Sequence, residues 1–410
     1  MSLVIKHANL RGEKRPKDIF IEGGRIIKIS DEITASGAEA IDAKGMLVTP
    51  AFVDSHLHLD KDMSSDWLDL RKPITKGTFW EEWDRARFLK EKETSRDIEA
   101  RARQVIASAV LNGTTAIRSH IDVDTICGLK RIKALLKLKG EFKNVIDIQA
   151  VAFPQEGILK DPGTEELLTK AVELGADLLG GIPEIEETKE AKKKHIEIIF
   201  RLARRFNVDV DMHIDQSQNP TWKNLELLVS RTKAEKYFGR VTASHVVSLA
   251  YCNDNYARKM IREVRESRIN VTTSPASTVI VGLGITRVKE FLAAGVNVSM
   301  GQDSIKDPWV PFGRADMLEV ALIGAHVLKI TRHDQIEKLF DMITTNGAVT
   351  LGLRDYGIHE GGIADLVVID ASNAQEAIRT GGDRRYVLKN GRKVAETKTT
   401  RTLLSTKLKG

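Results

Sequence analysis

Residues 47–62 read LVTPAFVDSHLHLDKD, an apolar run that ends in two histidines one residue apart. An apolar run of this length is typical of a buried strand. Side chains two apart on a strand point to the same face, so His56 and His58 would aim two imidazoles at one point. A metal ion needs that geometry. Histidine pairs also occur on protein surfaces without a metal ion. Whether His56 and His58 bind a metal therefore depends on whether the rest of the chain supplies further ligands.

Length and composition fit a soluble globular protein rather than a disordered or membrane protein. The 410 residues exceed one small domain, and 42% of them are hydrophobic and 29% charged. The net charge of +6 is spread along the chain without interleaved aromatic residues, which argues against nucleic-acid binding. Cys127 and Cys252 are far apart and indicate no disulfide framework. No leader segment or membrane-length apolar run is found, so a cytoplasmic location is expected.

Both ends of the chain are predicted to form short strands. Near the start, DIFIEGGRIIKIS has a hairpin turn at Gly23-Gly24, and AIDAKGMLVTP contains two strands joined at Lys44-Gly45. Near the end, IADLVVID is followed by RRYVLKNGRKVAE, with a turn at Asn390-Gly391. Neither set is large enough to bury a core alone. We therefore predict one small composite β-sandwich domain built from residues 1–50 and 355–410.

The middle of the chain, residues 51–354, alternates apolar strand-like runs with amphipathic helix-like segments. This alternation indicates βα units and a parallel sheet. Residues 95–113, for example, carry one apolar helical face and stop at Gly113. Eight units over this length predict a (β/α)8 TIM-type barrel, with a doubly wound open sheet as the alternative. The eight strand-like runs are PAFVDSH, TTAIRSHID, IDIQAVAFP, ADLLGGIP, VDVDMHID, RVTASHV, INVTTSP and VNVSMGQD.

A long polar segment follows the first predicted barrel strand. It covers residues 67–93 and holds three of the five tryptophans, Trp67, Trp80 and Trp83. Segments in this position lie over the mouth of a barrel, where active-site lids are found. We therefore expect residues 67–93 to form a lid.

Polar side chains gather where the predicted barrel strands end, which is where barrel enzymes carry their chemistry. Five of the ten histidines lie at such ends. Three histidines and one aspartate can hold one divalent ion and leave a position for water. Nitrogen and carboxylate ligands favour zinc or iron over calcium or magnesium. Bound water then ionises near neutral pH and supplies a hydroxide nucleophile. The strand-end residues are His56, His58, His120, Asp122, Gln155, Glu156, His213, Asp215, Gln216, His245 and Asp303.

Each strand-end residue taken alone also has a structural explanation. His120 is expected to be a core histidine that hydrogen-bonds to a neighbour rather than a metal ligand. Asp122 and Asp124 are candidates for capping the next helix. Asp215 orients a ligand or has no role in the site. The structural explanations do not account for all the strand ends together.

Several motifs resemble the amidohydrolase superfamily. They are FVDSHLHLD, TASH, the GQD that carries Asp303, and GIHEGGIADLVVID. Within the superfamily, VAFPQEGIL, GITRVKEFLAAGVNV and DPWVPFGRADML are similar to the bacterial cytosine deaminase group, which includes the enzyme that hydrolyses N-isopropylammelide. The resemblance implies a (β/α)8 barrel flanked by the composite β domain.

The resemblance also implies a ligand set and a substrate pocket. One iron or zinc ion would bind to His56, His58, His213 and Asp303. His245 would position the hydroxide, and Asp303 would also accept a proton. Gln155 and Trp309 match positions that hold the heterocycle. Binuclear members carry a carboxylated lysine on the fourth strand, and the corresponding run here, ADLLGGIP, has no lysine; one metal ion is therefore expected.

Two residues separate this chain from cytosine deaminases. Gln216 occupies the position of a glutamate that moves a proton onto the ring, and a glutamine cannot cycle a proton at pH 7. Lys61 matches a lysine of the N-isopropylammelide enzyme. Beside a cation and partly desolvated, it is a candidate proton donor. The alternative is a solvated loop lysine or a salt bridge to Asp60 or Asp62.

These observations predict a metal-dependent hydrolytic deaminase of a small nitrogen heterocycle, cytosine or a related pyrimidine or triazine. Metal-bound hydroxide would attack the ring carbon that bears the amino group, with Gln216 and Lys61 assisting. A cyclic amide hydrolase and a catalytically silent barrel are the alternatives. The expected partner is a small heterocyclic substrate, with no nucleic acid and no membrane, and the sequence leaves a homo-oligomer open.

Overall fold

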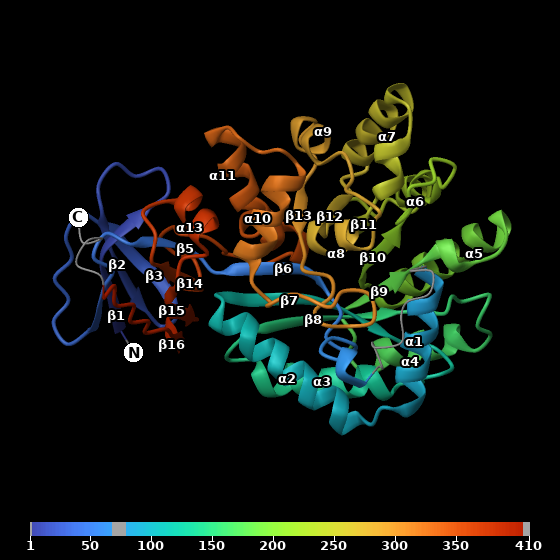
Figure 1. The fold of residues 1–410 in the computed structure, drawn as a ribbon, viewed down its shortest axis with the longest axis horizontal. Helices are drawn as coiled ribbons and strands as arrows, with labels where there is room; N and C mark the ends of the chain where they lie inside the picture. The colour runs from blue at the N-terminus through green and yellow to red at the C-terminus, as the bar shows by residue number, and fades with distance from the viewer. Residues whose placement is uncertain (1, 68–78, 405–410) are drawn as a thin grey trace.

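The structure is a computed structural model that describes residues 2–67 and 79–404. It contains a barrel and, beside it, a smaller β domain in which both ends of the described chain lie (Figure 1). The strands of the β domain come from both ends of the sequence: β1 (Ser2–Leu10), β2 (Lys17–Glu22), β3 (Arg25–Ser30), β4 (Glu39–Asp42), β5 (Leu47–Pro50), β14 (Leu366–Ile369), β15 (Arg384–Lys389) and β16 (Arg392–Glu396).

The β domain has the predicted composite architecture. Its strand order is β16-β15-β14-β5-β1-β2-β3, with β4 also paired to β1. β1 pairs with β4 over its first half, with β2 on both sides of an irregularity at which His7 has a φ of 51°, and with β5 at Asn9 and Leu10. Leu3 of β1 and Leu388 of β15 are buried in the same core. The two ends of the chain therefore stabilise each other.

The barrel confirms the predicted fold class, and each of the eight predicted runs contains one strand. The strands form one parallel sheet in sequential order, from β6 to β13. A bridge between Leu57 and Asp303 joins the first strand to the end of the last. The barrel strands are β6 (Phe52–Leu57), β7 (Thr114–Asp122), β8 (Asp147–Phe153), β9 (Leu178–Gly181), β10 (Asp209–Ile214), β11 (Val241–His245), β12 (Asn270–Thr273) and β13 (Val298–Met300).

Helices cover the outside of the barrel. In α2 (Ser95–Leu111) the Thr94 side chain and Asp97 form a capping box, and the predicted apolar face is buried. Among the described residues, no helix is long and apolar enough to cross a membrane. The other helices are α3 (Lys130–Phe142), α4 (Thr164–Glu173), α5 (Lys189–Phe206), α6 (Asn224–Ala234), α7 (Asp254–Glu266), α8 (Pro275–Ile280), α9 (Val288–Ala293), α10 (Met317–Val327), α11 (His333–Met342), α12 (Thr345–Leu351) and α13 (Ala374–Thr380).

The segment predicted to form a lid is only partly described. Residues 68–78 lie outside the described residues, and the rest contains the short helix η1 (Ser65–Trp67) and α1 (Phe79–Lys92). Trp83 and Lys90 of α1 are both buried. α1 therefore packs firmly against the barrel, and the lid itself remains a hypothesis.

Candidate active site

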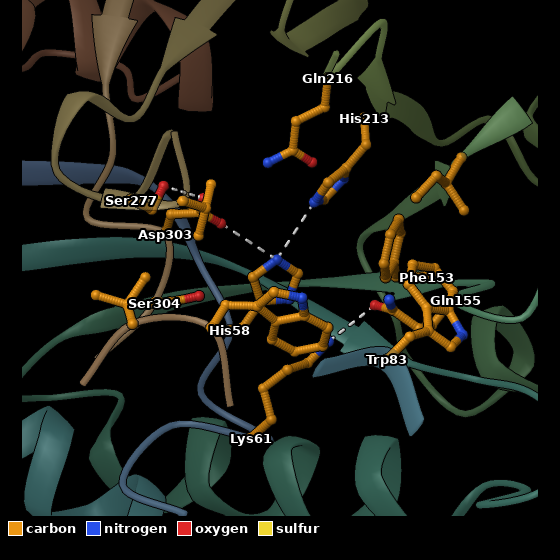
Figure 2. A pocket seen from close by; sticks show the side chains of 14 residues that line it. His58, Lys61, Trp83, Phe153, Gln155, His213, Gln216, Ser277, Asp303 and Ser304 are labelled. Atoms are coloured by element: carbon orange, nitrogen blue, oxygen red, sulfur yellow. Dashed lines mark hydrogen bonds and ion pairs between the residues drawn. The ribbon is translucent and has the colours of Figure 1, made fainter. Parts of the chain in front are cut away.

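Five of the sequence-predicted residues meet at the C-terminal end of the barrel, and we call them the imidazole cluster: His56, His58, His213, His245 and Asp303. Asp303 Oδ1 lies 3.3 Å from His56 Nε2 and 3.5 Å from His58 Nε2. The Nε2 atoms of His58 and His213 face each other at 3.3 Å (Figure 2). The ring centroid of His245 is 4.8 Å from those of His56 and of His213.

The imidazole cluster has the donor set of a divalent metal site. His56, His213, His245 and Asp303 each offer one ligand atom, and these atoms lie within 4.8 Å of one another. His56 Nε2 and both ring nitrogens of His245 are buried and have no hydrogen-bond partner among the described residues. Buried polar atoms are normally paired. The unpaired ring nitrogens therefore fit a bound cation.

The charge states of the imidazole cluster also suit a cation. Burial lowers the pKa of His58 and of His213 well below the usual histidine value, and that of His245 to about 4. Burial opposes ionisation of Asp303, but the neighbouring imidazoles of His245 and His56 hold its pKa below the usual range. Near pH 7 the site consists of neutral imidazoles with free lone pairs and one carboxylate, as metal binding requires.

Unusual backbone geometry brings the two edges of the barrel together at the cluster. Asp303 and His245 have positive φ angles, 71° and 76°, which non-glycine residues rarely adopt outside functional sites. The Asp303 N–H donates to the carbonyl of His56 at 2.7 Å. A Cβ added to Gly301 would lie 2.5 Å from the Cβ of His56. Only glycine allows this close approach.

A chain of hydrogen bonds orients His56. Its Nδ1 lies 3.0 Å from the Ser244 hydroxyl, which donates to Asp211 Oδ1 at 2.8 Å. Arg118 Nη1 donates to the other Asp211 oxygen at 2.9 Å. This arrangement directs His56 Nε2 toward Asp303 and is typical of the groups that orient metal ligands. Sequence reasoning missed these three partners, although Ser244 lies within the TASH motif and Asp211 shares a strand face with His213.

Asp303 is held from its other side by a residue that sequence reasoning also missed. The hydroxyl of Ser277 on α8 donates to Asp303 Oδ2 (Figure 2). Oδ1 is thereby left facing His56 and His58. The preceding strand, β12, ends without histidine or carboxylate, so the sequence contained no signal for this contact.

His120 is a core residue, as expected, but the predicted hydrogen bond is not found. Its ring is fully buried, 4.2 Å from that of His56 between centroids. Its Nε2 is 3.3 Å from Asp211 Oδ1, yet neither ring nitrogen makes a hydrogen bond among the described residues. His120 is therefore held by packing against His56 and by its polar contact with Asp211.

An inner cavity of about 520 Å³ opens above the imidazole cluster. His58, His213 and Asp303 line it together with the residues predicted to contact substrate and with aromatic side chains from the lid segment and the third barrel strand. The sequence-predicted residues Lys61, Gln155, Gln216 and Trp309 all line this cavity, as do Trp83, Phe153, Ile182, Ser277, Val281, Ser304 and Val310.

Lys61 is a buried residue, so the alternative of a solvated lysine or of a salt bridge to Asp60 or Asp62 is wrong. Only 1% of Lys61 is exposed, and its Nζ donates to Asp122 Oδ1 at 2.8 Å and to Gln155 Oε1 at 2.9 Å. The ammonium also lies 5.5 Å from the centroid of the Trp309 ring. Lys61 therefore touches both predicted substrate-binding side chains.

Asp122 joins Lys61 to a buried ion network, defined as Lys61, Lys90, Arg131, Asp60, Glu93, Asp122, Asp124 and Glu156. Lys90 of α1 bonds to Asp124 at 2.7 Å and to Glu156 at 2.8 Å. Burial disfavours the charged ammonium, but the surrounding carboxylates raise the pKa of Lys90 above its usual value. Arg131 of α3 bonds to Asp60, Glu93 and Asp122 at 2.6–2.9 Å.

The acidic residues predicted as helix caps have other roles. Asp122 belongs to the ion network and does not cap a helix. Asp124 accepts the N–H groups of Ile126 and Cys127 in the loop before α3. Asp215 instead holds the start of α6, since its carboxylate accepts the N–H groups of Asn224 and Leu225. It is a structural residue beside the site.

A parallel barrel with imidazoles and a carboxylate at its strand ends, below a cavity lined by amide and aromatic side chains, defines a metal-dependent hydrolase. The model of the amidohydrolase family matches residues 39–79 and 81–395, and the chain belongs to this family. It is therefore a hydrolase that acts on C–N bonds other than peptide bonds.

Relatives of known activity resemble the chain over nearly its whole length. The N-isopropylammelide isopropyl amidohydrolase of Pseudomonas sp. (strain ADP) is 35% identical over 395 residues, which are 95% of this chain and 96% of that protein. The 5-methylcytosine deaminase of Klebsiella pneumoniae, solved with 5-fluorocytosine, superposes with a TM-score of 0.91 at 32% identity, covering 98% and 99% of the two chains. For N-isopropylammelide isopropylaminohydrolase from Burkholderia multivorans the TM-score is 0.88 at 30% identity, covering 97% and 98%.

Proposed function

We propose that this chain is a hydrolytic deaminase of a small nitrogen heterocycle and that one zinc or iron ion binds to His56, His58, His213 and Asp303. The observation that carries the proposal is the convergence of these four side chains at the floor of a cavity walled by Gln155, Gln216 and Trp309. The similar proteins named above act on triazine and pyrimidine rings, which supports this substrate class.

The residues around the floor of the cavity have distinct roles in proton transfer. A bound divalent cation supplies the acidity that makes water a nucleophile near neutral pH. Asp303, fixed by Ser277, accepts a proton from the attacking water. His245 orients that water and passes the proton on. The leaving group is ammonia or an amine, to which Lys61 donates a proton, and the proton taken from water restores the Lys61 ammonium at the end of the cycle.

The walls of the cavity hold the ring. The Lys61 ammonium already donates to Oε1 of Gln155. The Nε2 group of Gln155 is therefore free to donate to a carbonyl oxygen or a nitrogen of the substrate ring. Trp309 offers a ring face, and its Nε1 is buried without a partner among the described residues. Gln216 both donates and accepts at the ring edge but transfers no proton. This combination favours a ring with several carbonyl and N–H groups, such as a hydroxylated triazine.

A substrate panel tests the proposal. Purified protein is loaded with zinc or iron, and its metal content is measured on the preparation that is assayed. Cytosine, 5-methylcytosine, ammelide and N-isopropylammelide are offered, and release of ammonia or isopropylamine is followed. We expect one metal ion per chain and turnover of at least one ring. A ring-opened product without amine release would identify a cyclic amide hydrolase, and full metal loading without turnover would identify a silent barrel.

A further inference from the structure

A second space adjoins the inner cavity, and we call it the outer chamber. Its volume is about 720 Å³, part of which is open to solvent, and it shares part of its wall with the inner cavity, namely Trp83, Ile182, His213 and Gln216. The residues that line only the outer chamber are Glu184, Ile185, Ser217, Trp222 and Leu283. Most of this wall is aromatic or aliphatic. A bare pyrimidine or triazine bound over the imidazole cluster would leave the outer chamber unfilled.

One acidic residue interrupts the apolar wall of the outer chamber. Glu184 lies in the short helix η2 (Pro183–Ile185) that follows β9. Its Oε1 accepts the backbone N–H of Asp215. Its Oε2 is shielded from solvent and has no hydrogen-bond partner among the described residues. An unpaired buried oxygen costs free energy unless something pairs with it.

The environment of Glu184 favours a neutral acid. Burial, and then the neighbouring Asp215 carboxylate, raise the pKa of Glu184 to about 8. At neutral pH the side chain therefore keeps its proton. With Oε1 occupied as an acceptor, the Oε2–H group is a hydrogen-bond donor in a mostly apolar chamber.

We propose that the outer chamber binds a mainly apolar substituent of the heterocycle, and that Glu184 donates a hydrogen bond to one acceptor atom on that substituent. The inference rests on the proposed function and narrows its substrate class to substituted rings. Apolar surface favours an alkyl or ether chain over a charged group. Glu184 then acts as a specificity-determining residue and takes no part in the bond that breaks.

Three probes with one ring test the proposal: ammelide, N-butylammelide and N-(2-methoxyethyl)ammelide. The last two have the same length and differ by an ether oxygen in place of one methylene. We expect N-butylammelide to exceed ammelide in kcat/KM by about three- to fourfold per buried methylene. The ether should match or exceed the butyl compound, because Glu184 pairs with its oxygen. Dissociation constants on the metal-loaded protein should follow the same order.

Variants of Glu184 separate its donor role from a structural one. Glu184→Gln keeps a neutral donor, so the ratio of ether to butyl turnover should stay near that of the wild type. Glu184→Leu removes the donor, and this ratio should fall about tenfold. If Glu184→Leu lowers thermal stability, the ratio still reports on the chamber, since both probes are measured on the same protein. An unchanged ratio in Glu184→Leu would overturn the assigned role.

Filling the chamber gives an independent test. Leu283→Trp should lower the ratio of N-butylammelide to ammelide turnover, whereas Phe312→Ser, which changes a side chain that is 68% exposed, should not. Equal loss on both probes in Leu283→Trp would overturn the chamber as a substituent site. Wild-type turnover of ammelide without any preference for the substituted rings would also overturn it and would leave the proposed deaminase function standing.

Discussion

The imidazole cluster and the ion network are two buried polar regions at the same end of the barrel, and they differ in how their polar atoms are paired. In the imidazole cluster, ring nitrogens of four histidines are buried without a hydrogen-bond partner among the described residues. In the ion network, Lys90 and Arg131 each face three carboxylates at 3.2 Å or less.

This difference indicates that the imidazole cluster serves to bind a ligand and that the ion network serves to stabilise the fold. Unpaired ring nitrogens destabilise the metal-free folded chain, so the metal site that we propose at the imidazole cluster costs stability while no cation pairs with it. In the ion network most charged atoms are paired with one another, although Asp60 Oδ1 and Arg131 Nη2 lack a hydrogen-bond partner among the described residues. These ion pairs fix α1, α3 and the loop that carries Lys61. Damage to the cluster should therefore remove metal and activity, and damage to the network should remove stability.

The largest expected effect follows from the carboxylate of the imidazole cluster. In Asp303→Asn the proton acceptor and the negative charge are lost, so we expect kcat to fall on the order of 10³–10⁴-fold, with reduced metal content. The free energy of unfolding of the metal-free protein should change little. Turnover, elemental analysis and urea unfolding measure the three quantities. His326→Ala, at an exposed position on α10, is the control. Wild-type turnover in Asp303→Asn would contradict the assignment.

A substitution in the ion network should lower stability and leave metal binding unchanged. Arg131→Met removes one guanidinium that three buried carboxylates share, and Asp60 then loses its only ion-pair partner among the described residues. We expect a loss of about 3–5 kcal/mol in the free energy of unfolding. Metal content per folded chain should stay at the wild-type value. Arg103→Met breaks the exposed pair with Glu141 and should cost at most about 1 kcal/mol. Equal losses of unfolding free energy in Arg131→Met and Arg103→Met would show that the buried ion pairs stabilise the fold no more than an exposed pair.

Lys61 belongs to the ion network and also lines the inner cavity above the imidazole cluster. A variant of Lys61 therefore tests whether a residue of the network also contributes to activity. Lys61→Met frees the carboxamide of Gln155 to rotate and removes a proton donor. We expect kcat/KM to fall about 10²-fold, the size of effect that misplaced substrate-binding groups produce. Metal content should not change. Lys137→Met, at an exposed lysine, is the matched control. Loss of metal in Lys61→Met would place Lys61 in the imidazole cluster instead.

Much of this arrangement could be predicted from the sequence because it depends on local periodicity. The barrel strands, the glycine turns and the histidines at strand ends all follow from alternation along short segments. The partners of these residues depend on strand register and on contacts across the barrel. Ser244 supports His56 from 188 positions away, and Lys61 pairs with Asp122 rather than with the adjacent Asp60 or Asp62. No local pattern indicates such contacts.

The imidazole cluster should also make stability depend on pH. Burial lowers the pKa of His245 to about 4, whereas an unfolded histidine titrates near 6.5. Between these values the unfolded chain binds the additional proton, so stability falls as pH decreases through this window. For the metal-free protein we expect His245 to account for about 2 kcal/mol of lost stability at pH 5 relative to neutral pH.

Urea unfolding at pH 7.5 and pH 5 measures the pH effect, and His245→Gln should flatten the dependence. His326→Ala should leave it unchanged. The same loss in His245→Gln as in the wild type would show that other groups dominate the acid sensitivity.

The smallest expected effect concerns substrate choice at the wall of the inner cavity. Gln216→Glu supplies a carboxyl group that can carry a proton to a ring nitrogen. We expect cytosine turnover to rise about tenfold, which is less than an optimally positioned acid–base group gives, because Lys61 and Gln155 still favour another ring. Ammonia release from cytosine and from ammelide measures the change, and metal content should stay constant.

The outcome of Gln216→Glu distinguishes two origins of the substrate preference. A gain confined to cytosine would mean that proton transfer at Gln216 alone excludes this ring from the wild-type enzyme. No gain would mean that the contact of Lys61 with Gln155, on the opposite wall, already fixes a different pattern of donors and acceptors. In that case Lys61 and Gln155, where the ion network meets the inner cavity, determine the substrate preference, and the imidazole cluster does not.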